Sequence, residues 1–336
     1  MRDCDRLAGM KRLIGNSVLV RAALTGALSL GVLGMVSATA AAQDWAKANL
    51  AKSPRHGEFV TIAEASGRKL QAWVVYPEVK GKAPVVVMIH EIYGQTDWAR
   101  EMADEVAGAG YIVVEPDLLS GFGPVAPNIG PNSAHPAPGM GCDPMPCTAK
   151  QTEDHMHMQA AAGAGAAFAP ASPGGTAAFP DQSAVTKAVS NLDPSTVTAD
   201  LDAAADYGKK LPAANGKLFV AGFCWGGGKS FAFATHRKDL SGAMVFYGSP
   251  PPVEAMKDIS APVYGFYAGN DARISATVPD TTTAMKAAGK TYEPVVYDGA
   301  GHGFMRAGEA PDASAANAAA RAAGFRRLVE LLGGVR

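Results

Sequence analysis

The sequence predicts an α/β fold in which a doubly wound, mostly parallel sheet carries helices on both faces. Apolar, β-rich runs alternate with helical patterns along most of the chain, and parallel strands joined by helical crossovers produce this alternation. One run, APVVVMIHE at 83–91, is apolar almost throughout, which is typical of a strand whose two faces are both buried.

The expected elements follow from these runs in chain order. A hairpin over 57–78 turns at Ser66-Gly67-Arg68 and precedes the strand at 83–91. The later expected strands cover 111–118, 217–223, 242–248, 262–271 and 291–299. The expected helices cover 97–108, a segment after Asn191-Leu192-Asp193-Pro194, 227–237, 281–288 and 313–332.

Residues 1–42 have the pattern of a signal peptide that is removed during export. Basic residues precede an uncharged apolar run at 22–36, which is shorter than the ~20 residues that cross a bilayer. Ala40 and Ala42 supply the small side chains that a signal peptidase requires. We therefore expect a cut before Gln43 and a periplasmic or secreted protein, with an uncleaved membrane anchor as the alternative.

The segment 43–336 has 294 residues, enough for a single large α/β domain. It carries 25 basic and 29 acidic residues, and this balance argues against nucleic-acid or anionic-membrane partners. We expect a monomer that acts on a small molecule, with no cofactor and no stable membrane association after cleavage. Asp3 and Asp5 are unusual in a leader, so translation from Met10 is an alternative to Met1.

Residues 121–190 interrupt the alternation, because they are rich in Gly, Ala and Pro and far exceed a βα connection of ~2–6 residues. We interpret them as an insertion at the carboxyl edge of the sheet, with a disordered excursion as the alternative. Within it, 140–158 reads MGCDPMPCTAKQTEDHMHM. Cys142 and Cys147 are expected to close a short disulfide loop. A copper or zinc site and unpaired thiols are the alternatives, although the spacing matches no metal signature.

A candidate nucleophile lies in Gly222-Phe223-Cys224-Trp225-Gly226, which fits the pattern G-x-nucleophile-x-G between a strand and a helix. The two glycines are expected where a β-carbon would collide with neighbouring backbone. The free N–H groups and positive dipole end of the helix would favour a thiolate. A buried cysteine at a crowded strand–helix junction is the alternative.

An acid and a histidine follow in the order that this turn requires. Asp271 ends the strand PVYGFYAGN, and His302 lies in DGAGHGF, each where a strand gives way to a glycine-bearing loop. Cys224 would attack a carbonyl carbon, His302 would exchange the proton, and Asp271 would orient the imidazole. The backbone N–H groups of Trp225 and Ile92 would bind the oxyanion.

These residues resemble the dienelactone hydrolases (carboxymethylenebutenolidases), a family of the α/β-hydrolase fold. The resemblance covers roughly 57–120 and 193–332. Its anchors are His90-Glu91-Ile92-Tyr93-Gly94, Pro116-Asp117-Leu118, Gly222-Phe223-Cys224-Trp225-Gly226-Gly227, Gly269-Asn270-Asp271 and Gly299-Ala300-Gly301-His302-Gly303-Phe304. It implies that Cys224, Asp271 and His302 form a triad and that Ile92 and Trp225 form the oxyanion hole.

The resemblance also implies a role for Glu91. At rest this carboxylate would share hydrogen bonds with a neutral, turned-away thiol, and substrate binding would displace it so that Cys224 ionises. Such a thiol resists oxidation until substrate is bound. The alternative is a structural ion pair of Glu91 with Arg100 or Lys229.

The substrate is less constrained. Where the family has an aromatic residue and two arginines for a substrate carboxylate, this chain reads 119–121 LSG and 276–279 ATVP. Tyr93, Phe246, Tyr247 and Arg306 are the candidate substrate contacts, with a core role as the alternative for Phe246 and Tyr247. We expect an ester or lactone hydrolase that works through a covalent acyl-thioester. The alternatives are a non-catalytic scaffold that binds a small ligand and a metal-binding protein that acts through the insertion.

Overall fold

The computed structural model describes residues 43–123 and 174–334, which lie in one compact unit. The predicted signal peptide and the pair Cys142 and Cys147 fall outside the described residues. None of the described helices is long and apolar enough to cross a lipid bilayer.

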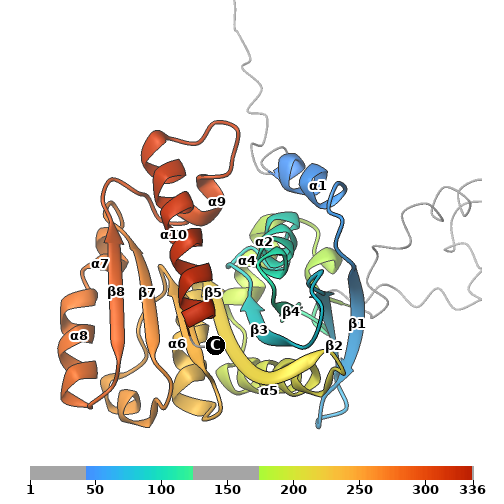
Figure 1. The fold of residues 1–336 in the computed structure, drawn as a ribbon, viewed down its shortest axis with the longest axis horizontal. Helices are drawn as coiled ribbons and strands as arrows, with labels where there is room; N and C mark the ends of the chain where they lie inside the picture. The colour runs from blue at the N-terminus through green and yellow to red at the C-terminus, as the bar shows by residue number, and fades with distance from the viewer. Residues whose placement is uncertain (1–42, 124–173, 335–336) are drawn as a thin grey trace, which may run out of the picture. The chain divides into compact units, whose positions relative to one another are not determined.

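The described residues contain an eight-stranded sheet in the order β1-β2-β4-β3-β5-β6-β7-β8, with β1 and β8 at its two edges (Figure 1). The strands are β1 Gly57–Ala63, β2 Lys69–Val75, β3 Ala83–Ile89, β4 Ile112–Pro116, β5 Ala214–Phe223, β6 Gly242–Phe246, β7 Val263–Ala268 and β8 Tyr292–Tyr297. β2 pairs antiparallel with β1 and β4, and the pairs from β4 through to β8 are parallel. The predicted hairpin, the predicted strands and the mostly parallel sheet are therefore confirmed.

The helices are α1 Asp44–Leu50, α2 Asp97–Gly108, α4 Gln182–Ser190, α5 Pro194–Lys210, α6 Trp225–His236, α7 Ala272–Ser275, α8 Val278–Ala287, α9 Phe304–Ala307 and α10 Ala315–Gly334. Short 3₁₀ turns, η3 Thr176–Ala178 and η4 Val253–Asp258, complete the described elements. Capping fixes several starts: Asp193 accepts from Thr196 N, and Pro194 occupies the first turn of α5, so this helix begins where the sequence predicts.

The alternation of side chains along β3 divides the core into two layers. Val85, Val87 and Ile89 belong to a cluster that includes buried residues of α5, α6 and α8. Val86 and Met88 belong to a second cluster, which includes buried residues of α2 and α10. Because successive strand residues face opposite sides, both faces of the sheet are covered, and the doubly wound arrangement is confirmed.

Four of the described helices were not predicted, and two of them, α7 and α9, have only four residues each. α4 lies inside the segment interpreted as an insertion, where Asp181 caps its first turn and Val185 and Val189, four residues apart, are buried. Two buried valines are a weak helical pattern, and the segment before them is rich in Gly, Ala and Pro residues, so the sequence did not indicate this helix. α1 precedes the hairpin and contacts α2, and its Asn49 donates to Glu101 at 3.0 Å.

The hairpin turn is anchored to the rest of the fold through Arg68. Its guanidinium pairs with Asp200 of α5 and donates to the carbonyl oxygen of Ser120 at 2.7 Å. Asp200 is fully buried, and its other carboxylate oxygen has no hydrogen-bond partner. The ion pair therefore offsets a buried charge that would otherwise be costly.

We predict that Arg68→Met lowers the free energy of unfolding by about 3–5 kcal/mol, because it leaves the buried charge of Asp200 uncompensated. Urea denaturation of residues 43–336 measures this loss. The double variant Arg68→Met/Asp200→Leu is the matched control and should recover part of the stability, since it removes the buried charge of Asp200 while Glu64, which pairs with Arg68 at 2.7 Å, still loses its partner. A loss below about 1 kcal/mol in the single variant would place this pair among the weak surface pairs.

Candidate active site

The parallel strands bring the predicted catalytic residues to one edge of the sheet. Glu91 follows β3, Cys224 follows β5, Asp271 follows β7 and His302 follows β8. All four strands run in the same direction, so these residues lie at the carboxyl ends, the usual position of ligand sites in open α/β sheets. Residues more than two hundred positions apart thereby become neighbours.

Cys224 lies in a sharp turn between β5 and α6, with φ 56° and ψ −116°. A β-carbon on Gly222 would lie 2.0 Å from the carbonyl oxygen of Gly226, and one on Gly226 would lie 2.3 Å from the carbonyl oxygen of His90. The backbone N–H of Cys224 donates to the carbonyl oxygen of Phe246 at 3.0 Å. The glycines are therefore required by close backbone approach, as the sequence motif predicted.

Cys224, His302 and Asp271 form a continuous hydrogen-bonded chain. His302 Nε2 lies 3.1 Å from Cys224 Sγ, and its Nδ1 lies 2.5 Å from Asp271 Oδ2. Asp271 is buried and therefore presents a fixed acceptor to the imidazole. With the proton of Nδ1 directed at the carboxylate, Nε2 is free to take the proton of the thiol.

The surroundings of Cys224 favour the neutral thiol. Burial is the main effect that raises the thiol pKa, and the nearby charge of Glu91 raises it further. Hydrogen bonds from the backbone N–H groups of Trp225 and Ile92 act in the opposite direction and lower the pKa. These two N–H groups are the predicted oxyanion donors, and both favour the thiolate form of Cys224.

Glu91 is engaged by a different partner from those expected. Arg306 Nε donates to Glu91 Oε2 at 2.7 Å, and the Tyr247 hydroxyl lies 3.5 Å from Oε1. The alternatives Arg100 and Lys229 were wrong: the first pairs with Asp97, and the ammonium of the second lies over the Trp225 ring. Burial raises the pKa of Glu91, and the charge of Arg306 opposes this effect.

The expected resting arrangement also differs from the structure. The thiol is directed at His302, so it is not turned away, and the oxygens of Glu91 are engaged by Arg306 and Tyr247. The physical reason is that Arg306, on α9 immediately after the histidine loop, supplies an opposite charge to the buried carboxylate.

The four candidate substrate contacts fall into two groups. Arg306 lies over the partly exposed ring of Tyr93, 5.1 Å from the guanidinium carbon to the ring centroid, and both residues remain beside the site. Phe246 is fully buried between the rings of Phe223 and Phe266, so the structure assigns it to the core. Tyr247 is also fully buried, at φ 40°, and its ring makes a T-shaped contact with the ring of His302, with centroids 5.1 Å apart.

The returning end of the predicted insertion lies against the same edge. Thr176 donates its backbone N–H to Asp117 Oδ2 at 2.7 Å, and its hydroxyl accepts from Gln95 N at 2.9 Å. Gln182 donates to the carbonyl oxygen of Tyr93 at 3.2 Å. Residues 174–182 therefore hold the loops after β3 and β4. No sequence motif indicates these contacts, because they join segments that are far apart in the chain.

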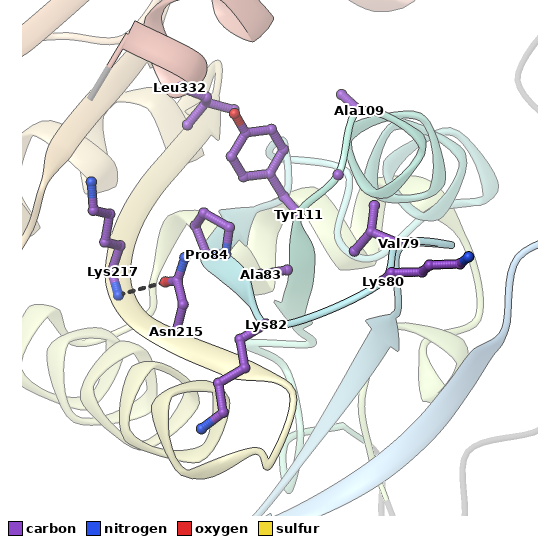
Figure 2. Close-up of a pocket in the computed structure, with 11 residues that line it drawn as sticks. Val79, Lys80, Lys82, Ala83, Pro84, Ala109, Tyr111, Asn215, Lys217 and Leu332 are labelled. Carbon is purple, nitrogen blue, oxygen red and sulfur yellow. Dashed lines mark hydrogen bonds between the residues drawn. The ribbon is translucent and has the colours of Figure 1, made fainter. Parts of the chain in front are cut away.

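A separate hollow lies at the amino ends of the strands, opposite the carboxyl ends that carry Cys224 (Figure 2). Its volume is ≈ 410 Å³, and its lining includes Ala83 at the start of β3, Asn215 near the start of β5, and the side chain of Tyr111. Lys217 also lines the hollow, and its backbone N–H donates to Asn215 Oδ1 at 3.0 Å. Because this hollow is at the amino ends of the strands, it is not part of the site around Cys224.

Comparisons with known proteins identify relatives over most of the chain. The model of the dienelactone hydrolase family matches residues 70–335. A Salmonella typhi protein named "Putative carboxymethylenebutenolidase" is 26% identical over 257 residues, covering 73% of this chain and 77% of that protein. The carboxymethylenebutenolidase of Pseudomonas putida is 25% identical over 251 residues, covering 74% of this chain and 86% of that enzyme.

A solved structure agrees with the fold. The crystal structure named "Putative Dienelactone Hydrolase" from Klebsiella pneumoniae has a TM-score of 0.59 and 24% identity, and the match covers 83% of this chain and 98% of that chain. The sheet order and this likeness confirm the α/β-hydrolase fold that the sequence predicted.

We predict that Glu91→Gln lowers the pKa of the Cys224 thiol, because the carboxylate charge is one of the causes that raise it. The rate of alkylation by iodoacetamide, measured against pH and read at Cys224 by peptide mass spectrometry, should therefore rise at lower pH than in the wild type. The exposed carboxylate of Glu254 provides the control variant Glu254→Gln. If the curves of Glu91→Gln and the wild type superimpose, the charge of Glu91 does not affect the thiol pKa and the prediction is wrong.

Proposed function

This chain belongs to the dienelactone hydrolase family, and from that membership and the geometry of the site we propose that it hydrolyses carboxylic esters or lactones through Cys224. The observation that carries the proposal is the hydrogen-bonded chain from Asp271 through His302 to the sulfur. In this proposal the substrate acyl group is transferred to the thiol and then to water.

In the acylation step, the thiol gives its proton to His302 Nε2, and the sulfur attacks the carbonyl carbon. The carbonyl oxygen becomes an oxyanion that accepts hydrogen bonds from Ile92 N and Trp225 N. The carbon–oxygen bond of the ester then breaks as His302 returns the proton to the leaving alkoxide. For a lactone, this alcohol stays attached to the acyl chain, which is held as a thioester on Cys224.

In the deacylation step, His302 takes a proton from water, which attacks the thioester carbonyl. The same two N–H groups bind the second oxyanion, and the carbon–sulfur bond breaks. The thiolate then recovers the proton from the imidazolium, and the carboxylic acid leaves. Asp271 stabilises the imidazolium in both steps and does not take up the proton itself.

Glu91 is proposed to control when the thiol ionises. While its carboxylate stays beside the site, its charge and the burial of Cys224 keep the thiol protonated. Substrate binding that displaces Glu91 would remove one of these causes and lower the thiol pKa. Arg306 is placed to take part, because it holds Glu91 and lies over Tyr93.

We propose that the protein is exported and that residues 1–42 are removed. A cut before Gln43 would keep the contact between Gln43 Oε1 and the backbone N–H of Trp98, a distance of 3.2 Å at the start of α2. A neutral thiol suits an oxidising compartment, because oxidation of cysteine follows thiolate character.

We predict that Cys224→Ala abolishes hydrolysis of p-nitrophenyl acetate by the mature protein, because it removes the nucleophile. The glycines of the turn remain, so circular dichroism should show an intact fold. His302→Ala should lose comparable activity, whereas Asp271→Asn should retain more, since it disturbs the orientation of the base without removing it. Near-wild-type turnover by Cys224→Ala would refute the nucleophile.

We predict that expression of the full chain in a bacterial host gives a mature protein in the periplasm or medium whose first residue is Gln43. Cell fractionation and N-terminal sequencing measure this outcome. Ala40→Lys/Ala42→Lys is the matched variant and should accumulate as uncleaved precursor, because signal peptidase requires small residues there. Full-length wild-type protein in the cytoplasm would contradict export.

A further inference from the structure

His90 is a fully buried histidine to which the proposed acyl transfer assigns no role. It is the first residue after β3 and has no exposed surface. Burial lowers its pKa, which favours the neutral imidazole. The thiol is served by His302 instead, at 3.1 Å.

The neighbours of His90 fix its tautomer. The backbone N–H of Leu118 donates to Nε2 at 3.4 Å, so this nitrogen is the acceptor. The proton therefore lies on Nδ1, which donates to the carbonyl oxygen of Glu91 at 2.7 Å. The imidazole thus links the loop after β3 to the loop after β4.

The carbonyl that His90 holds belongs to the same peptide unit as the N–H of Ile92. A trans peptide is planar, and its carbonyl and N–H point in opposite directions. Fixing the Glu91 carbonyl toward His90 therefore directs the Ile92 N–H to the other side of the peptide, and this N–H favours the thiolate of Cys224. One imidazole hydrogen bond thus sets the direction of one oxyanion donor.

The second oxyanion donor is also in contact with His90. The imidazole stacks on the Trp225 ring, with centroids 5.8 Å apart and planes at 11°. The backbone of His90 approaches Gly226 so closely that a β-carbon there would lie 2.3 Å from the His90 carbonyl oxygen. The loop that carries Ile92 is therefore packed directly on the first turn of α6.

We propose that His90 is a positioning residue for the oxyanion hole, acting through its Nδ1–H bond to the Glu91 carbonyl and its contact with Trp225. It does not touch the reacting atoms. This inference rests on the proposed acyl transfer, because an oxyanion hole has a purpose only if a carbonyl is attacked. Loss of the Nδ1–H bond should lower kcat and leave KM nearly unchanged, since the donor acts mainly in the transition state.

The test compares His90→Asn with His90→Gln, because an asparagine amide reaches the position of Nδ1 and a glutamine amide reaches that of Nε2. With p-nitrophenyl acetate as the probe, we expect His90→Gln to lower kcat by about 10- to 100-fold, approaching the loss caused by deletion of one oxyanion donor. His90→Asn should stay within about fivefold of the wild type. KM and the midpoints of the pH–rate profile should change little in either variant.

Two further measurements separate positioning from folding. Alkylation of Cys224 by iodoacetamide needs no oxyanion hole, so its plateau rate at high pH should be similar in both variants, as should their circular dichroism spectra. Equal kcat values for the pair would overturn the proposal, and so would loss of kcat in both together with loss of alkylation or fold. A wild-type protein without hydrolysis, or an active Cys224→Ala, would instead overturn the proposed function.

Discussion

The strained turn at Cys224 is the constraint on which the rest of the site depends. A non-glycine residue at φ 56° costs on the order of 1–3 kcal/mol, so its surroundings must hold it there. Here the bond from Cys224 N to Phe246 O and the tight contacts at Gly222 and Gly226 do so. The turn places the sulfur within reach of a histidine from β8.

This geometry also brings opposing electrostatic effects together on one sulfur. The start of α6 and the N–H groups of Ile92 and Trp225 favour the thiolate, whereas burial and Glu91 favour the neutral thiol. Burial and Glu91 have the larger effect, so the pKa of the Cys224 thiol is raised. The Glu91–Arg306 pair is thus the part of the site whose rearrangement would change the charge of Cys224, and it is buried on the carboxylate side.

The fold and the order of the candidate catalytic residues were predictable because each depends on local sequence. The glycines at 222 and 226 mark the turn, and the loops that carry Asp271 and His302 end buried apolar strands. Parallel pairing then brings the strand ends together without further information. The family resemblance that these motifs carried was confirmed by the match over residues 70–335.

The errors concern side-chain directions between distant elements. The partner of Glu91 is Arg306, 215 residues away in the chain, and the sequence alone does not indicate which cation the carboxylate meets. Phe246 and Tyr247 are adjacent aromatic residues, and only the packing of β6 between β5 and β7 shows that both are buried. Tyr247 has a positive φ although it is not a glycine, so the sequence does not indicate this backbone conformation.

The central claim is that the sulfur of Cys224 carries the acyl group during turnover. Rapid acid quenching of the protein comprising residues 43–336 during hydrolysis of p-nitrophenyl acetate, followed by peptide mass spectrometry, tests it directly. We predict one acetyl group on the peptide that contains Cys224, and an initial burst of nitrophenol of about one equivalent when deacylation is the slower step. Continued hydrolysis with the acetyl group on another residue would contradict the account.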